Sequence, residues 1–120
     1  MSVYEKVYDK LEADNFSVFP PNTHVGDVTD KYVVLGDGGR YQAGTNSSQT
    51  VLIDVMCYVP GSRFTDLDGY ASLIKGSINE LFPLVIPTGN ETQAFYDESI
   101  KGWMKSVEYR YTVRNRFLRG

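Results

Sequence analysis

The stretch KYVVLGDGGRYQAGTNSSQTVLIDVMCYVP, residues 31–60, decides the fold. From residue 50 to residue 59, apolar residues alternate with a more polar set, which is typical of a strand with one buried face. Residues 31–35 are rich in β-branched side chains and predict a shorter strand that pairs antiparallel with it. Residues 36–49 exceed an ordinary hairpin loop and show no apolar periodicity, so we predict a glycine-rich extended arm that contacts a partner. A surface loop without a function is the alternative.

Two helices and two further strands are expected around this pair. Ser2 is typical of an N-cap with Glu5 as its capping-box partner, and predicts a helix over residues 3–12. A second helix is predicted from Thr65 to Phe82. Its apolar stripe, which should lie on the sheet, comprises Leu67, Tyr70, Ala71, Ile74, Ile78 and Leu81. Residues 93–96 predict a short strand, and the alternation up to residue 114 predicts a long one that starts at residue 103 or 105. Segment 16–29, which contains two prolines, is expected to be irregular, and residues 88–90 to form a turn.

These elements predict an α+β fold with a single domain over residues 1–120. We expect a mainly antiparallel four-stranded sheet with two helices packed on one face, and the long extended arm between the first two strands. The length suits one modest core.

The composition indicates a folded protein without a membrane partner. Of 120 residues, 42% are hydrophobic and 22% are charged, which disfavours a disordered chain. No segment approaches 18 consecutive apolar residues, and none has the pattern of a secretion signal, so we expect an intracellular protein. Cys57 falls on the apolar side of its strand, where we expect an inert buried thiol.

The charges are distributed unevenly along the chain. The last twenty residues contain a single acid, Glu108, among several bases, whereas the preceding hundred are strongly acidic. We therefore predict that Arg110, Arg114 and Arg116 form a basic interface strand that meets an acidic patch on a second copy or on another protein. A solvated basic tail is the alternative. Nucleic-acid binding is disfavoured because no base-reading motif is present.

No catalytic, cofactor-binding or metal-binding residues are identified. Residues 36–40 lack the Lys-Ser/Thr pair of a phosphate-binding loop, and His24 has no second ligand nearby in the sequence, so it is expected in a surface loop. We predict that the protein is not an enzyme and has no cofactor; a hydrolase or transferase with a carboxylate-only site is an alternative.

The arm is the candidate site, with Arg40 and Tyr41 as its anchors. Its candidate inter-subunit or partner-binding residues are Gly36, Asp37, Arg40, Tyr41, Gln42, Thr45 and Asn46.

The whole sequence resembles the bacteriophage tail terminator, or tail completion (head-tail joining), proteins of long-tailed phages. The resemblance rests on four features in order: an opening amphipathic helix ending near Leu11, the stretch YVVLGDGGRYQAGTNSSQTVLIDVMCYVP, a helix from Phe64 to Phe82, and a terminal KSVEYRYTVRN strand. It spans nearly the full length of the chain.

This resemblance implies an α+β fold and a homohexameric ring that caps the tail tube, ends tail polymerisation and forms the head-tail joining interface. It also implies these partners: further copies of the chain, the major tail tube protein and the head-tail connector proteins, with DNA passing through the ring without specific binding. The protein would be made in the host bacterial cytoplasm and be located in the virion, at the tail-head junction. In such a ring the arm would line the channel or reach a neighbouring subunit. The alternative from another class is a small binding adaptor that grips a partner protein through the arm.

Overall fold

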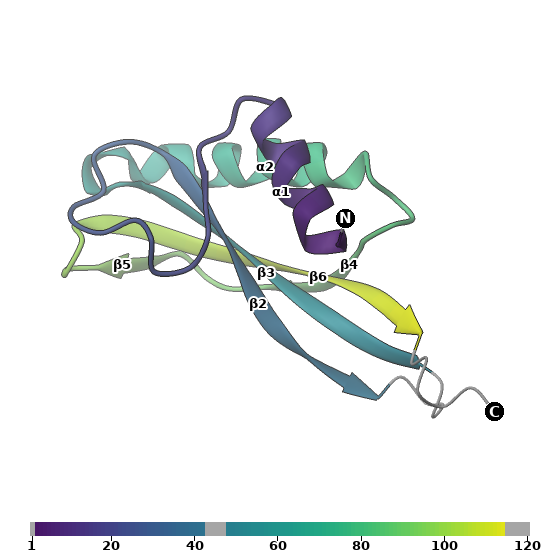
Figure 1. Cartoon of the computed structure of the whole chain (residues 1–120). Helices are drawn as coiled ribbons and strands as arrows, with labels where there is room; N and C mark the ends of the chain where they lie inside the picture. Colours follow the sequence, from purple (N-terminus) through teal and green to yellow (C-terminus); the bar gives the residue numbers. More distant parts are fainter. Residues whose placement is uncertain (1, 43–47, 115–120) are drawn as a thin grey trace.

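Strand β3 (Ser48–Pro60) is the centre of the fold in the computed structural model, which describes residues 2–42 and 48–114. Along its whole length β3 pairs antiparallel with β6 (Gly102–Arg114), and on its other side it pairs antiparallel with β2 (Tyr32–Gln42). The remaining elements are α1 (Val3–Ala13), β1 (Val18–Phe19), the 3₁₀ helix η1 (Gly61–Asp66), α2 (Leu67–Asn79), β4 (Ile86–Glu91) and β5 (Phe95–Asp97). Figure 1 shows both helices on the same side of the sheet.

The fold is α+β, but the predicted four-stranded, mainly antiparallel sheet is wrong. The sheet has six strands in the order β1-β2-β3-β6-β4, β5 also pairs with β6, and β1 runs parallel to β2. β1 is only two residues long and precedes two prolines, so it has no alternation to detect. β4 contains Pro87 and a register irregularity up to Glu91, where Gly89 has a φ of +90°. Proline is tolerated there because β4 is an edge strand.

The predicted arm over residues 36–49 is also wrong for most of its length. β2 continues to Gln42 and β3 begins at Ser48, so most of those residues belong to paired strands. A β-bulge between Asp37 and Gly39 shifts the register, and β2 pairs with β3 on both sides of this bulge. The Asp37 side chain accepts a hydrogen bond of 2.7 Å from the Gly39 amide, and Gly39 has a φ of +88°. Glycine and aspartate therefore form a bulge here, not a loop.

The first helix begins at the predicted residue and ends one residue later than predicted, whereas α2 begins two residues later and ends three residues earlier than the predicted second helix, so that Leu81 lies outside it. Ser2 and Glu5 form the predicted capping box at the start of α1. The second helix differs, because Thr65 lies in η1 and α2 starts at Leu67 without a side-chain cap. Tyr4 and Tyr8 donate hydrogen bonds from α1 to the carbonyls of Leu35 and Val18, so α1 is fixed to the sheet by polar as well as apolar contacts.

The core lies between the helices and the odd-numbered residues of β3. Ile53, Val55 and Cys57 are at most 2% exposed, and Ile74 and Ile78 of α2 are fully buried with them. This agrees with the predicted strand face and helix stripe. Burial raises the pKa of the Cys57 thiol to about 12, so the thiol is neutral and inert at physiological pH.

The opposite sheet face is covered at only one end. There the irregular segment after β1 folds over the strands, and the ring of His24 stacks on Tyr32 at 4.0 Å, with Tyr58 stacked on the other side of Tyr32 at 4.8 Å. His24 lies in an irregular segment, as expected, but it is half-buried because its ring belongs to this aromatic stack. The far end of the same face has no such cover among the described residues.

Candidate functional site

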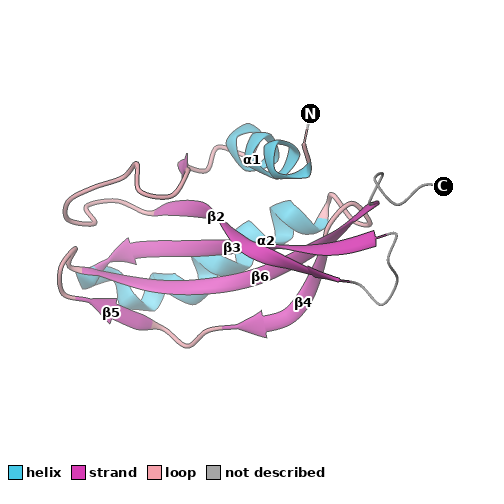
Figure 2. Ribbon diagram, turned by 60° about the horizontal axis from the view of Figure 1, so that its bottom comes forward, coloured by secondary structure: helices cyan, strands magenta, loops and turns pink. Residues whose placement is uncertain are grey.

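The ends of three strands form what we call the tongue, defined as residues 36–42 of β2, 48–54 of β3 and 108–114 of β6, and most of the tongue projects beyond the helices. Figures 1 and 2 show these strand ends extending past both helices, and the molecule measures 56 × 26 × 25 Å. β1 pairs only with Val33 and Val34, and β4 reaches no further along β6 than Arg110. Within the described chain, the outer edge of β2 in the tongue and the outer edge of β6 beyond Arg110 therefore have no neighbouring strand.

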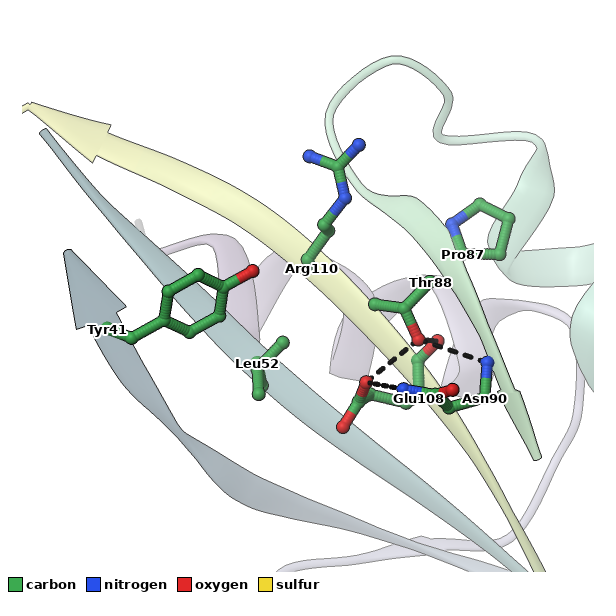
Figure 3. Close-up of a pocket in the computed structure, with 7 residues that line it drawn as sticks. All are labelled: Tyr41, Leu52, Pro87, Thr88, Asn90, Glu108 and Arg110. Carbon is green, nitrogen blue, oxygen red and sulfur yellow. Dashed lines mark hydrogen bonds between the residues drawn. The ribbon is translucent and has the colours of Figure 1, made fainter. Parts of the chain in front are cut away.

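A shallow groove lies on the open sheet face at the base of the tongue (Figure 3). It measures about 510 Å³ and is lined by Tyr41, Leu52, Pro87, Thr88, Asn90, Glu108 and Arg110. The three long strands supply Tyr41, Leu52, Glu108 and Arg110, because even-numbered residues of β3 and β6 face away from the helices. β4 closes the groove on its other side.

Glu108 is held at the floor of the groove by β4. Its Oε1 accepts a hydrogen bond of 2.8 Å from the Thr88 hydroxyl and one of 3.0 Å from the Asn90 amide. Thr88 Oγ1 also accepts from the Asn90 backbone amide, so the three residues form one network (Figure 3). The Thr88 and Asn90 side chains fix the Glu108 carboxylate in place without neutralising its charge.

Asp54 lies directly opposite Glu108 on the neighbouring strand, with the two residues paired in the β3/β6 register. Burial raises the pKa of the Asp54 carboxyl, and the negative charges of Glu108 and Asp37 raise it further. Neither Asp54 nor Glu108 forms an ion pair with any described residue. Like charges directly opposite one another destabilise a sheet, so this acidic pair opposes folding of the isolated chain.

The structure separates the two predicted anchors of the arm. Tyr41 lines the open-face groove and is 53% exposed. Arg40 pairs with Val51 and so lies on the face that carries the helices, where its guanidinium donates a hydrogen bond of 3.2 Å to Gln49. Arg40 and Tyr41 therefore cannot contact one partner surface through the same face of the tongue.

The other predicted arm residues have structural roles or lie outside the described chain. Gly36 packs closely on Met56, since a β-carbon there would lie 2.9 Å from the Met56 Cε atom, and Asp37 closes the bulge. Gln42 pairs with Gln49 in the backbone register. Thr45 and Asn46 lie outside the described residues.

The predicted basic interface strand is only partly described. Arg110 lies on the open face and lines the groove, but it shares this face with Glu108, so the surface is mixed in charge. Arg114 pairs with Ser48 at the end of the tongue, and Arg116 lies outside the described residues.

Sequence reasoning missed Thr88, Asn90 and the acidic pair. Alternation in each strand put Asp54 and Glu108 on polar faces, but only the register places them opposite one another.

A second exposed surface lies at the other end of β6. The ring of Trp103 packs between Phe64 at 4.4 Å and Tyr96 at 5.2 Å, and the Trp103 indole donates a hydrogen bond of 3.3 Å to the Gly61 carbonyl. Phe64 is about half exposed, and Tyr96 is 38% exposed. Aromatic groups gathered at a surface are typical of contacts between proteins.

Across residues 2–42 and 48–114, no cluster of three or more His, Cys, Asp or Glu side chains has an arrangement that could hold a metal ion. None of the described helices has both the length and the apolar character needed to cross a membrane. In comparisons with known proteins, no family model and no curated protein matches this sequence.

Proposed function

We propose that this chain is a structural phage protein that caps the tail tube as a homohexameric ring, ends tail polymerisation and provides the surface on which the head docks. The proposal comes from the resemblance to tail terminator proteins. Its partners would be further copies of itself, the tail tube protein and the connector proteins of the head.

The tongue is the observation that carries this proposal. It is an ordered projection of three strands that leaves backbone groups on two outer edges and an uncovered sheet face at one end of an elongated molecule. Exposed strand edges are a liability for a protein that acts alone, and natural proteins usually cover or shorten them. A subunit of an assembly has neighbours that bury such surfaces.

The two ends of the molecule suit different contacts. The tongue carries charged and polar groups, whereas the opposite end carries the exposed aromatic surface around Trp103. A ring that joins a tube to a head connector needs distinct surfaces for its two partners and for its neighbours. This division of surfaces supports a joining role.

Electron microscopy of the purified protein tests the proposal directly. We expect rings with a central channel, and a native mass that corresponds to six copies. A monomer or dimer at every concentration and salt condition would contradict the ring and favour the adaptor that binds one partner protein.

A genetic test addresses the place of action. In a phage that lacks this gene, the protein supplied from a plasmid should restore tails of normal length that carry heads. Normal particles without the protein would contradict the proposed role.

A further inference from the structure

The open face of the tongue carries two carboxylates, Asp54 and Glu108, that form no ion pair with any described residue. Glu108 is fixed by Thr88 and Asn90, so it cannot move away from Asp54 without losing two hydrogen bonds. Two nearby lysines are paired elsewhere: Lys105 contacts Asp68 and Glu91 on the helix side, and Lys75 also contacts Glu91. Arg110 lines the same groove but forms no ion pair with either carboxylate. An acidic pair held in place within a regular sheet departs from local rules, and such departures are expected at functional sites.

A basic segment follows the tongue in the sequence. Directly after β6, the chain continues as Asn-Arg-Phe-Leu-Arg-Gly, with Arg116 and Arg119 flanking two apolar residues. Arginine suits a pair of carboxylates because its planar guanidinium donates two parallel hydrogen bonds. The groove also offers apolar surface from Leu52 and the exposed ring of Tyr41 for the residues between the arginines.

The position of Arg116 in the sequence favours a contact with the acidic pair of a second copy over that of its own chain. Glu108 and Arg114 are six residues apart on an extended strand, which is a distance of about 20 Å. Arg116 is two residues beyond Arg114, and two extended residues span about 7 Å. Even if the chain reversed directly after Arg114, the backbone of Arg116 would stay about 13 Å from that of Glu108, so we expect Arg116 to meet this pair on a second copy.

We propose that the segment around Arg116 of one copy docks on the open sheet face of a second copy, where its guanidinium neutralises Asp54 and Glu108. This inference rests on the proposed assembly into rings. The two contact surfaces differ, so each copy donates its basic segment to one neighbour and accepts the segment of another. A contact of this head-to-tail kind can close into a ring.

Two full-length variants with complementary defects test this contact. The acceptor variant D54N/E108Q lacks the negative charges, while the amide that replaces the Glu108 carboxylate keeps an oxygen that can accept from Thr88 and Asn90. The donor variant R116E/R119E lacks the basic segment's positive charges. Each should remain monomeric in sedimentation at low salt, with self-association at least about tenfold weaker than that of the natural protein.

A mixture of the two variants provides the sharpest outcome. The D54N/E108Q protein still has a basic segment, and the R116E/R119E protein still has an acidic face, so the mixture should form one-to-one dimers that cannot grow further. The control D9N/E98Q makes the same change in net charge at two exposed acids and should assemble normally. Circular dichroism checks that all variants are folded.

Unchanged assembly of D54N/E108Q, or a mixture that stays monomeric, would overturn the docking proposal. If the natural protein nevertheless forms rings, the proposed function stands and a different contact builds them. If the mixture forms dimers but the natural protein forms no closed ring, the contact stands and the ring function fails.

Discussion

The backbone of Gly102 packs directly against the side chain of Val28. A β-carbon on Gly102 would lie 2.4 Å from Val28 Cγ2 and 2.7 Å from Val28 Cβ. Val28 is 4% exposed and its amide donates a hydrogen bond of 2.7 Å to the Ile100 carbonyl. This contact joins the irregular segment before β2 to the start of β6, and so to the far side of the sheet.

Gly102→Ala should destabilise the protein because the added methyl group has no space beside Val28. We expect a loss of about 1–3 kcal/mol in the free energy of unfolding, the usual cost of overpacking, measured by chemical denaturation. Gly69→Ala is the matched control. Gly69 lies inside α2 with open space around it, so this change should add about 0.5–1 kcal/mol. Equal effects of the two changes would contradict the proposed packing.

Ile53→Ala should cost about 2–5 kcal/mol of unfolding free energy, since Ile53 is 2% exposed between β3 and the helices. Leu73→Ala serves as the control, because Leu73 is 65% exposed on the outer side of α2 and should change stability by less than about 0.5 kcal/mol. Thermal or chemical unfolding gives both values. A small loss at Ile53 would mean that β3 presents its other face to the core.

Cys57 should resist thiol reagents in the folded protein. Its side chain is fully buried and burial raises its pKa to about 12, so at pH 8 the nucleophilic thiolate is both scarce and inaccessible. A chromogenic disulfide reagent should react with one thiol per chain in denaturant and far more slowly without it. Rapid reaction in buffer would show that the core opens readily.

Asp54→Asn should stabilise the isolated chain at pH 7. The raised pKa of Asp54 means that the folded state binds a proton more tightly than the unfolded state, so ionisation of this carboxyl opposes folding. We expect a gain of about 0.2–1 kcal/mol at neutral pH, the range for a cross-strand pair. This gain should shrink as the pH falls through the raised pKa, because the natural carboxyl then becomes neutral.

Asp14→Asn should show the opposite pH dependence. Hydrogen bonds from Lys10 and Ser77 lower the pKa of Asp14, so its ionised form stabilises the folded state. The variant should be less stable at neutral pH, and the difference should disappear as the pH falls through the lowered pKa. Denaturation curves between pH 2 and pH 8 compare both variants; the same sign for both would contradict the assigned environments.

The sequence predicted those parts of the fold that depend on local patterns. Alternation identified β3 and β6, and the Ser2 and Glu5 capping box located the start of α1. The apolar stripe of α2 also faces the core as expected. In each case one short stretch contains the information, because burial of a single face sets the residue pattern.

The parts that failed depend on pairing partners far away in the sequence. Residues 36–42 lack apolar periodicity because the tongue has no helix layer over most of its length, yet hydrogen bonds to β3 keep them in a strand. The sequence of β4 resembles that of a turn, because Gly89 and Asn90 lie where the pairing of this edge strand with β6 is irregular. The acidic pair at Asp54 and Glu108 follows only from the register between β3 and β6, which neither strand specifies by itself.

The pairing of β3 with β6 also determines the order in which the chain can fold. Every residue of β3 from Ser48 to Pro60 has its partner in Gly102–Arg114, so this edge of the central strand cannot be fully paired during synthesis until residue 114 has left the ribosome. A nascent chain that ends before β6 can form the β2–β3 hairpin, but it exposes that edge and the apolar face beneath it. Such contacts between distant segments form slowly and leave intermediates prone to aggregation. Production of this protein therefore depends on how quickly β6 reaches β3 after translation, and fragments that stop short of Gly102 should accumulate in inclusion bodies.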